Sequence, residues 1–116
     1  MDRRRIDLRT IEPFLVREIR GSLSRGPAFL LVCVLGPITE EILDRGLVYE
    51  HCLRFLPVAG AILLNSLLFA VAHGSPVQMA VAFAAGLLFS LARKKTGTVT
   101  APVIMHILIN LSVSLF

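Results

Sequence analysis

Hydrophobic residues dominate the chain from Pro27 onward, and short polar or turn-forming stretches divide them. Arg54 and Pro57 mark one turn, Gly74-Ser75-Pro76 marks a second, and Arg93-Lys94-Lys95-Thr96-Gly97 indicates a basic loop at a membrane interface. Pro102 suits the first turn of a helix. The pattern therefore predicts four apolar helices, at about Pro27 to Leu56, Val58 to His73, Val77 to Leu91, and Pro102 to Phe116.

Residues 1–26 follow a different pattern. Apolar residues recur there at helical spacing with arginines between them, which is typical of an amphipathic helix lying on a membrane surface. A plain solvated helix fits the same pattern. We expect one domain, with a basic N-terminal segment over 1–26 and a membrane-embedded core over 27–116.

Composition strengthens the membrane interpretation. The chain is 55% hydrophobic and its mean hydropathy is +0.76, well above the norm for soluble proteins. The formal net charge is +4, and seven of the twelve basic residues precede Pro27, which favours contact with anionic lipid headgroups over nucleic acid. Cys33 and Cys52 both lie in apolar stretches and are expected to be free, buried thiols. We predict an all-α, polytopic membrane bundle.

One acidic cluster, at residues 40–45, stands out in the first apolar helix. A charged group at the centre of a bilayer costs roughly 3 kcal/mol or more, so such groups are usually retained for a function. Glu41 and Arg45 have the i,i+4 spacing and orientation of an intrahelical ion pair. That pairing leaves Glu40 without a partner, and an unpaired carboxylate in an apolar setting is a candidate general base.

Two histidines can reach the depth of this cluster. Glu40 lies sixteen residues before Leu56 and His73 lies seventeen after it, so a hairpin brings the two to similar depth and favours an encounter. His106 and Asn110 are spaced by four on the last helix. His106 reaches the same depth if the residues from Thr98 to Ala101 are extended, so we predict a non-helical segment before Pro102.

Two further features concern helix packing. Ala82, Gly86 and Ser90 form a stripe of small residues that lets a neighbouring helix approach closely. Gly36-Pro37 predicts a kink just before the acidic cluster. Asn65 and Ser66 are interpreted as packing and hydrogen-bonding residues.

Three motifs now stand in order on successive apolar helices: Glu40-Glu41-x-x-x-Arg45, Phe69-x-x-x-His73 and His106-x-x-x-Asn110. Their order and approximate spacing resemble the CAAX-protease and bacteriocin-processing family of intramembrane proteases, which includes the Ras-converting type of prenyl-protein endopeptidase. The similarity covers about residues 28–116. It implies an integral membrane endopeptidase, expected in a prokaryotic cytoplasmic membrane, that acts on a peptide or a prenylated protein.

The resemblance also implies residue roles. Glu40 would activate a water, His73 would help to hold that water, and His106 and Asn110 would stabilise the oxyanion. Glu41 and Arg45 would support the structure of the site. Amide hydrolysis needs a base within reach of a water and donors aimed at the tetrahedral oxygen, and these residue types supply both without a cofactor.

The chain departs from the family pattern in two respects. Asp44 stands where family members commonly have an apolar or aromatic residue. The family usually has about eight membrane helices, whereas this chain has room for four and a surface helix. A minimal form, a fragment, and a subunit that needs an oligomer or a partner are all compatible with this length.

Two alternatives stay open from the sequence. Glu40, His73 and His106 could hold Zn²⁺ with an open position for water, although the chain has no His-Glu-x-x-His motif. The other alternative is a non-catalytic bundle, an immunity or scaffold protein that binds a peptide or partner. His106 and Asn110 would then only hold helices together, at about 0.6 kcal/mol per hydrogen bond.

Overall fold

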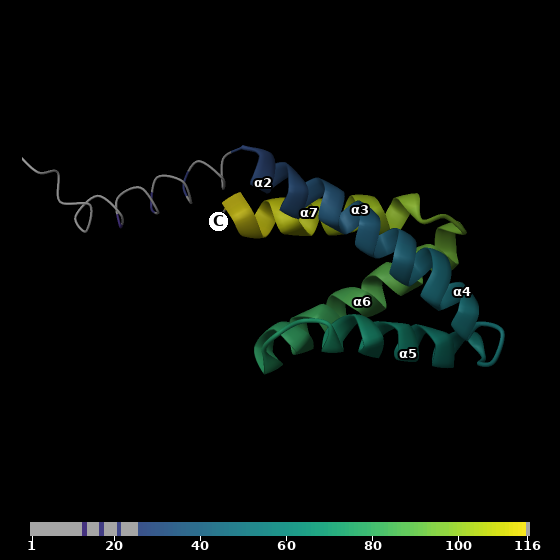
Figure 1. Ribbon diagram of the computed structural model, residues 1–116. Helices are drawn as coiled ribbons and strands as arrows, with labels where there is room; N and C mark the ends of the chain where they lie inside the picture. Colours follow the sequence, from purple (N-terminus) through teal and green to yellow (C-terminus); the bar gives the residue numbers. More distant parts are fainter. Residues whose placement is uncertain (1–12, 14–16, 18–20, 22–25, 116) are drawn as a thin grey trace, which may run out of the picture.

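The computed structural model describes residues 13, 17, 21 and 26–115, so the amphipathic helix expected over residues 1–26 lies almost wholly outside the described part. Every regular element within 26–115 is helical (Figure 1). The prediction of an all-α fold is therefore confirmed.

The first apolar stretch forms one nearly continuous helical rod that alternates between ordinary and wider, π-type turns. In the wider turns a backbone N–H bonds five residues back, as the N–H of Gly36 does to the carbonyl of Leu31. This wide turn directly precedes Pro37, which has no N–H to donate and whose ring crowds the preceding turn of an α-helix. At Gly36-Pro37, where a kink was predicted, the helix has a widened turn and continues into the next helical segment. The rod consists, in order, of α2 (Pro27–Leu30), η1 (Leu31–Leu35), α3 (Gly36–Glu41), η2 (Ile42–Val48) and α4 (Tyr49–Cys52).

Three longer helices follow the rod: α5 (Val58–Val71), α6 (Pro76–Thr96) and α7 (Thr100–Leu115). Two predicted boundaries were wrong. His73 lies in the turn after α5, because Gly74-Ser75-Pro76 ends the helix and Ser75 caps α6 by accepting from the N–H of Gln78 at 3.2 Å. The predicted basic loop at 93–95 is the last turn of α6, where cationic side chains are favourable, and Gly97 ends the helix with a φ of +70°.

The extended segment expected at Thr98 to Ala101 is shorter than predicted. Only residues 97–99 are non-helical, and α7 begins at Thr100. Pro102 lies within the first turn of α7, as expected, because the helix starts two residues before it.

The small-residue stripe packs α6 tightly against α5. Ala82, Gly86 and Ser90 are all buried, as predicted. At Gly86 an added Cβ would lie only 3.2 Å from the Cα of Ser66 on α5, so a larger residue would require the neighbouring helix to shift. On its other side α6 packs against α7, and α7 packs against α3 and η1.

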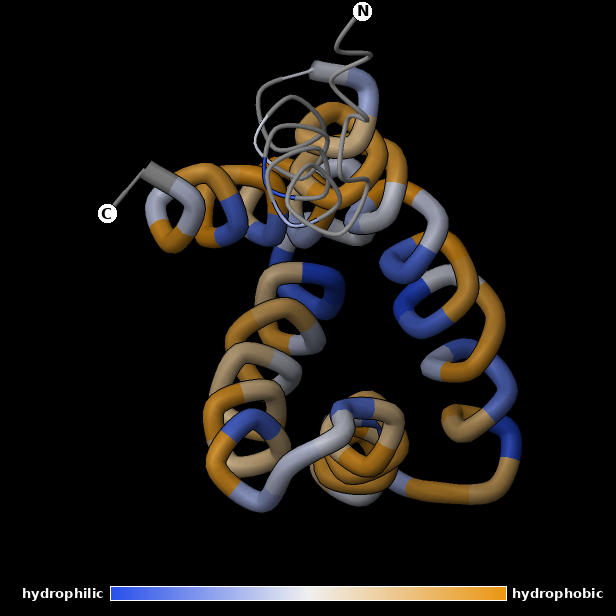
Figure 2. The backbone as a smooth tube through the Cα atoms, turned by 60° about the vertical axis from the view of Figure 1, so that its left-hand side comes forward, coloured by the Kyte–Doolittle hydropathy of each residue, from blue (hydrophilic) through white to orange (hydrophobic). Residues whose placement is uncertain are grey.

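Large apolar side chains cover the outside of the molecule, and several charged and polar side chains are buried between the helices. Figure 2 shows a largely hydrophobic tube, and large aliphatic side chains of every long helix are exposed. The charged and polar side chains that are buried come from several helices: Glu41, Arg45, Asn65, Ser66, Ser90 and His106. An apolar exterior with polar groups buried between helices is the arrangement expected of helices in lipid.

The length of one helix, α6, also supports a location in a membrane. Within the described residues α6 is long and apolar enough to cross a bilayer, whereas Val58–Val71 and Thr100–Ser114 are apolar but shorter. The number of membrane crossings therefore stays a prediction.

Candidate active site

The ion pair predicted between Glu41 and Arg45 is present and completely buried. Arg45 Nε lies 3.3 Å from Glu41 Oε2, and both side chains have no exposed surface. Arg45 also donates from Nη2 to the carbonyl of Gly86 at 3.0 Å, and its guanidinium lies 4.4 Å from the ring centroid of Phe69. The pair thus ties the first rod to α5 and α6.

His106 joins this pair from α7. Its Nδ1 lies 2.8 Å from Glu41 Oε1, which is hydrogen-bonding distance. The imidazole stacks on the ring of Phe89, with centroids 4.9 Å apart, and meets Phe69 edge-on. These contacts fix the ring so that Nε2 points toward Glu40, whose Oε2 is 3.7 Å away.

The two adjacent glutamates have different surroundings. The side chain of Glu41 is completely buried, whereas that of Glu40 is 49% exposed and has no ion-pair partner except His106 among the described residues. Glu40 can therefore reach water or a substrate, and Glu41 cannot. Successive residues of a helix point about 100° apart, which is why sequence neighbours separate in this way.

A cavity of about 400 Å³ lies on one side of His106, between the end of α5, the first half of α6, and α7. We call it the histidine cavity. His73, His106 and Asn110 contribute its polar side chains together with Gln78, and its other walls are the aromatic rings of Phe69 and Phe89 and aliphatic side chains. An apolar pocket with a few convergent polar groups is the usual form of a binding or catalytic site.

His73 and Asn110 are each held by one backbone contact. Nδ1 of His73 lies 2.8 Å from the carbonyl of Phe69, so Nδ1 donates and Nε2 is left to the cavity. Asn110 donates from Nδ2 to the carbonyl of Val32 at 3.2 Å. That bond uses one of the two amide hydrogens, and the second is available to a ligand.

The structure thus brings together most of the predicted site. Three of the four residues expected to be catalytic line one cavity, and Glu40 is connected to it through His106. No hydrogen bond or ion pair joins Glu40 directly to His73 within the described residues. The roles of all four stay a prediction.

Several supporting residues were not predicted. Phe89, which stacks on His106, lies three residues after Gly86 and so continues the buried face of α6. A second buried network links Asn65 to the carbonyl of Asp44 at 2.8 Å and the hydroxyl of Ser90 to Asn65 at 3.0 Å. Only the role of Asn65 in this network was expected from the sequence.

The surroundings of the two cysteines and of Ser66 match those predicted from the sequence. Cys33 and Cys52 are free and buried, as predicted. The hydroxyl of Ser66 donates to Ile62 within its own helix. Cys33 lies 3.3 Å from the hydroxyl of Ser114, which adds a contact between η1 and α7.

The zinc alternative was tested against the donor geometry. Among residues 26–115, no three side chains of His, Cys, Asp or Glu converge closely enough to hold a metal ion. No hydrogen bond or ion pair joins Glu40 to His73 within these residues either. The arrangement does not fit a three-ligand zinc site.

These features define a class of helical protein with an apolar surface, a buried ion pair and a histidine-lined cavity. Comparison with known sequences narrows the class. Residues 23–112 match the family described as Type II CAAX prenyl endopeptidase Rce1-like, and the chain belongs to this family. The resemblance that its three motifs indicated is thereby confirmed.

One curated relative is the membrane-embedded CAAX protease MroQ of Staphylococcus aureus (strain USA300). It is 32% identical to this chain over 97 residues, which cover 78% of this chain and 39% of the relative. The chain therefore spans about two fifths of the length of that relative. No solved structure matches the chain.

Proposed function

We propose that this chain is an integral membrane endopeptidase in which Glu40 activates a water to hydrolyse a peptide bond. Membership of the CAAX endopeptidase family supports the protease class. The substrate would be a peptide or a prenylated protein, and the bacterial relative supports a prokaryotic cytoplasmic membrane as the location.

The observation that carries this proposal is the unequal exposure of the two glutamates around one histidine. Glu40 is half-exposed beside Nε2 of His106, and Glu41 is buried against Nδ1 of the same ring. A general base must reach the water that it activates, which favours Glu40. A buried carboxylate on the far ring nitrogen fixes the orientation of a catalytic histidine. Glu41 would therefore be a positioning residue.

These positions support the following reaction. Glu40 takes a proton from a water held by His73, and the resulting hydroxide attacks the peptide carbonyl. The oxyanion that forms accepts from the free amide hydrogen of Asn110, and from Nε2 of His106 when that nitrogen is protonated. Collapse of the intermediate breaks the C–N bond, and the proton on Glu40 passes to the leaving amine.

The test is cleavage of a membrane peptide by the chain reconstituted in liposomes. Glu40→Gln should lower the cleavage rate by about 100-fold or more, because general base catalysis typically contributes that much. Thr39→Val is the matched control. Its hydroxyl is exposed and bonds only to the carbonyl of Leu35 in its own helix, so this variant should cleave like the wild type.

The peptide should be offered with and without a prenyl group, which separates the two substrate classes. Wild-type cleavage rates in the Glu40→Gln variant would refute the catalytic role of Glu40. A wild-type chain that binds the peptide without cleaving it would instead favour the non-catalytic bundle.

A further inference from the structure

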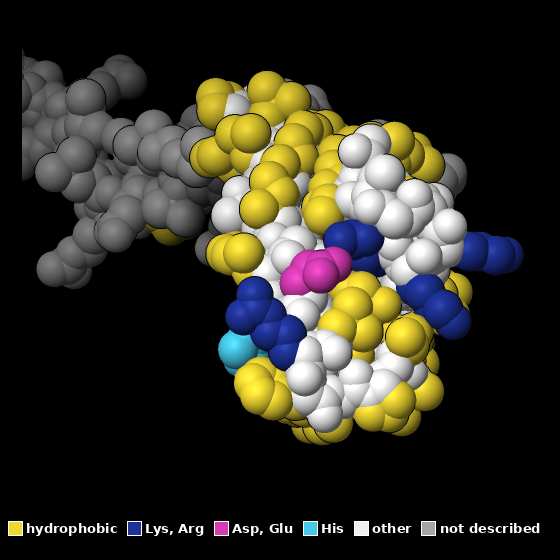
Figure 3. All heavy atoms as spheres, turned by 90° about the vertical axis from the view of Figure 1, so that its right-hand side faces the viewer, with side chains coloured by type: hydrophobic (Ala, Val, Ile, Leu, Met, Phe, Trp, Pro, Cys, Tyr) yellow, Lys and Arg dark blue, Asp and Glu magenta, His cyan; other side chains and the backbone are white. Residues whose placement is uncertain are grey.

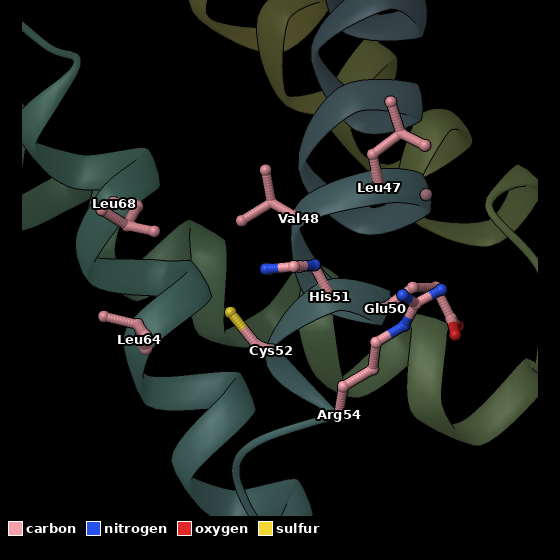
Figure 4. A pocket seen from close by; sticks show the side chains of 9 residues that line it. Leu47, Val48, Glu50, His51, Cys52, Arg54, Leu64 and Leu68 are labelled. Atoms are coloured by element: carbon pink, nitrogen blue, oxygen red, sulfur yellow. The ribbon is translucent and has the colours of Figure 1, made fainter.

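A second concavity lies between the first rod and α5, and it shares no residue with the histidine cavity. Its volume is about 580 Å³, within the range of small-ligand pockets, and it is open on one side. We call it the outer groove. Figure 4 shows its walls, which come from η2 and α4 on one side and from α5 on the other. The residues that matter for its chemistry are Leu47, Val48, His51, Arg54, Leu64 and Leu68.

The outer groove changes from apolar to basic along its length. Leu47 and His51 lie on the first rod, and Arg54 lies in the turn that follows it. On α5, Leu64 and Leu68 lie about 9 and 15 Å along the helix from its start, at ~1.5 Å per residue. The basic end of the groove therefore lies at the α4–α5 turn, and the apolar end lies deeper.

The charge at the basic end is not neutralised locally. Glu50 borders the groove, but its carboxylate is held by Arg93 at 2.6 Å. No carboxylate of the described residues lies within ion-pairing distance of the exposed Arg54. Lys94 and Lys95 lie in the last turn of α6, at the same end of the molecule. This end therefore carries four basic residues (Arg54, Arg93, Lys94 and Lys95) and one acidic residue, Glu50. Figure 3 shows basic side chains on both sides of an acidic one here.

We propose that the outer groove binds one anionic phospholipid of the bilayer. An acyl chain would lie against Leu47, Val48, Leu64 and Leu68, and the phosphate of the headgroup would meet Arg54 and His51. The order of these groups matches a lipid in its membrane orientation, with the charged end at the turn and the chain directed inward. The free guanidinium selects an anionic headgroup over a zwitterionic one. The site is separate from the catalytic residues, so it does not depend on the proposed function.

The experiment is native mass spectrometry of the purified full chain in detergent with phosphatidylglycerol or phosphatidylcholine of identical acyl chains. The wild type should retain phosphatidylglycerol at least about fivefold better, the ratio that corresponds to ~1 kcal/mol for one basic residue at a charged membrane surface. Arg54→Gln should abolish this preference. Leu64→Trp should lower the retention of both lipids, because the indole fills the apolar end.

Lys94→Gln is the matched control, since it removes one positive charge at the same end without touching the groove lining. It should retain phosphatidylglycerol like the wild type. Equal losses in Lys94→Gln and Arg54→Gln would show that only overall charge matters, and would overturn the site. Wild-type retention by both Arg54→Gln and Leu64→Trp, measured on variants with unchanged thermal unfolding, would overturn it as well.

Discussion

Two glutamates that look alike in the sequence differ in burial. Glu40 and Glu41 are neighbours, yet one is half-exposed and the other is enclosed by Arg45 and His106. Removing one partner of a buried ion pair typically costs about 3–5 kcal/mol, because the other charge is left without compensation. Exposed groups such as Glu40 can be changed with little loss of stability. Substitution of Glu41 should therefore lower the stability of the fold, whereas substitution of Glu40 should lower the cleavage rate.

Asn110 offers a second test at the residue scale. Asn110→Ala should lower the cleavage rate by about 100-fold, because removing one oxyanion donor typically costs that much. Ser112→Ala is the control on the same helix, since this exposed hydroxyl bonds only to the carbonyl of Leu108. If Asn110 only ties α7 to Val32, Asn110→Ala would cleave like the Ser112→Ala control, and its role would be structural.

At the scale of helices, the close approach of α5 and α6 positions Arg45. Gly86 supplies the carbonyl that Arg45 donates to, and it lies opposite Ser66 and Phe69. The contact permits one buried guanidinium to reach both the carboxylate of Glu41 and the ring of Phe69. The site therefore depends on a residue that has no side chain.

Gly86→Ala should lower the free energy of unfolding by about 1–3 kcal/mol, the usual cost of overpacking. The added methyl would lie 3.2 Å from both Arg45 Nη2 and the Cα of Ser66, so the helices must move apart. Thermal unfolding in detergent measures the effect. Gly74→Ala is the control, because no atom lies within 4 Å of its added Cβ. Equal unfolding temperatures for the two variants would contradict the packing account.

The sequence predicted the helices better than their ends. Apolar runs and the 82–86–90 stripe depend on local pattern, and these predictions were confirmed. The end of α6 was misplaced because Arg93 to Lys95 look like an interfacial loop, while Gly97 was the actual stop signal.

The site was predicted only in part, because its contacts join different helices. The pair of Glu41 and Arg45 lies within one helix and could be derived from spacing. The contact between His106 and Glu41 depends on the rotation of α7 about its axis, which spacing does not determine. Phe89 was missed for the same reason, since its stacking on His106 appears only when α6 and α7 pack.

At the scale of the whole molecule, the helices alternate in direction (Figure 1), so the turn before α6 and the turn after it lie at opposite ends. At ~1.5 Å per residue, α6 is about 31 Å long, which matches the hydrocarbon thickness of a bilayer. Four of the five basic residues within 26–115 lie at the end where α4 and α6 terminate: Arg54, Arg93, Lys94 and Lys95.

Single cysteines at Gly74 and Lys94 should therefore react with an impermeant thiol reagent from opposite sides of the membrane. The background is a chain in which Cys33 and Cys52 are replaced by alanine. Right-side-out and inverted vesicles provide the two orientations. Reaction of both positions from the same side would show that α6 does not cross the bilayer.

The central claim is that Glu40 performs the chemistry and Glu41 holds the site together. Its most direct test compares Glu40→Gln with Glu41→Gln, measuring the rate of peptide cleavage and the unfolding temperature of each variant. We predict that Glu40→Gln loses cleavage by about 100-fold and keeps its unfolding temperature, while Glu41→Gln unfolds at a clearly lower temperature. A Glu40→Gln variant that cleaves at the wild-type rate, or a Glu41→Gln variant that loses cleavage at unchanged stability, would contradict the account.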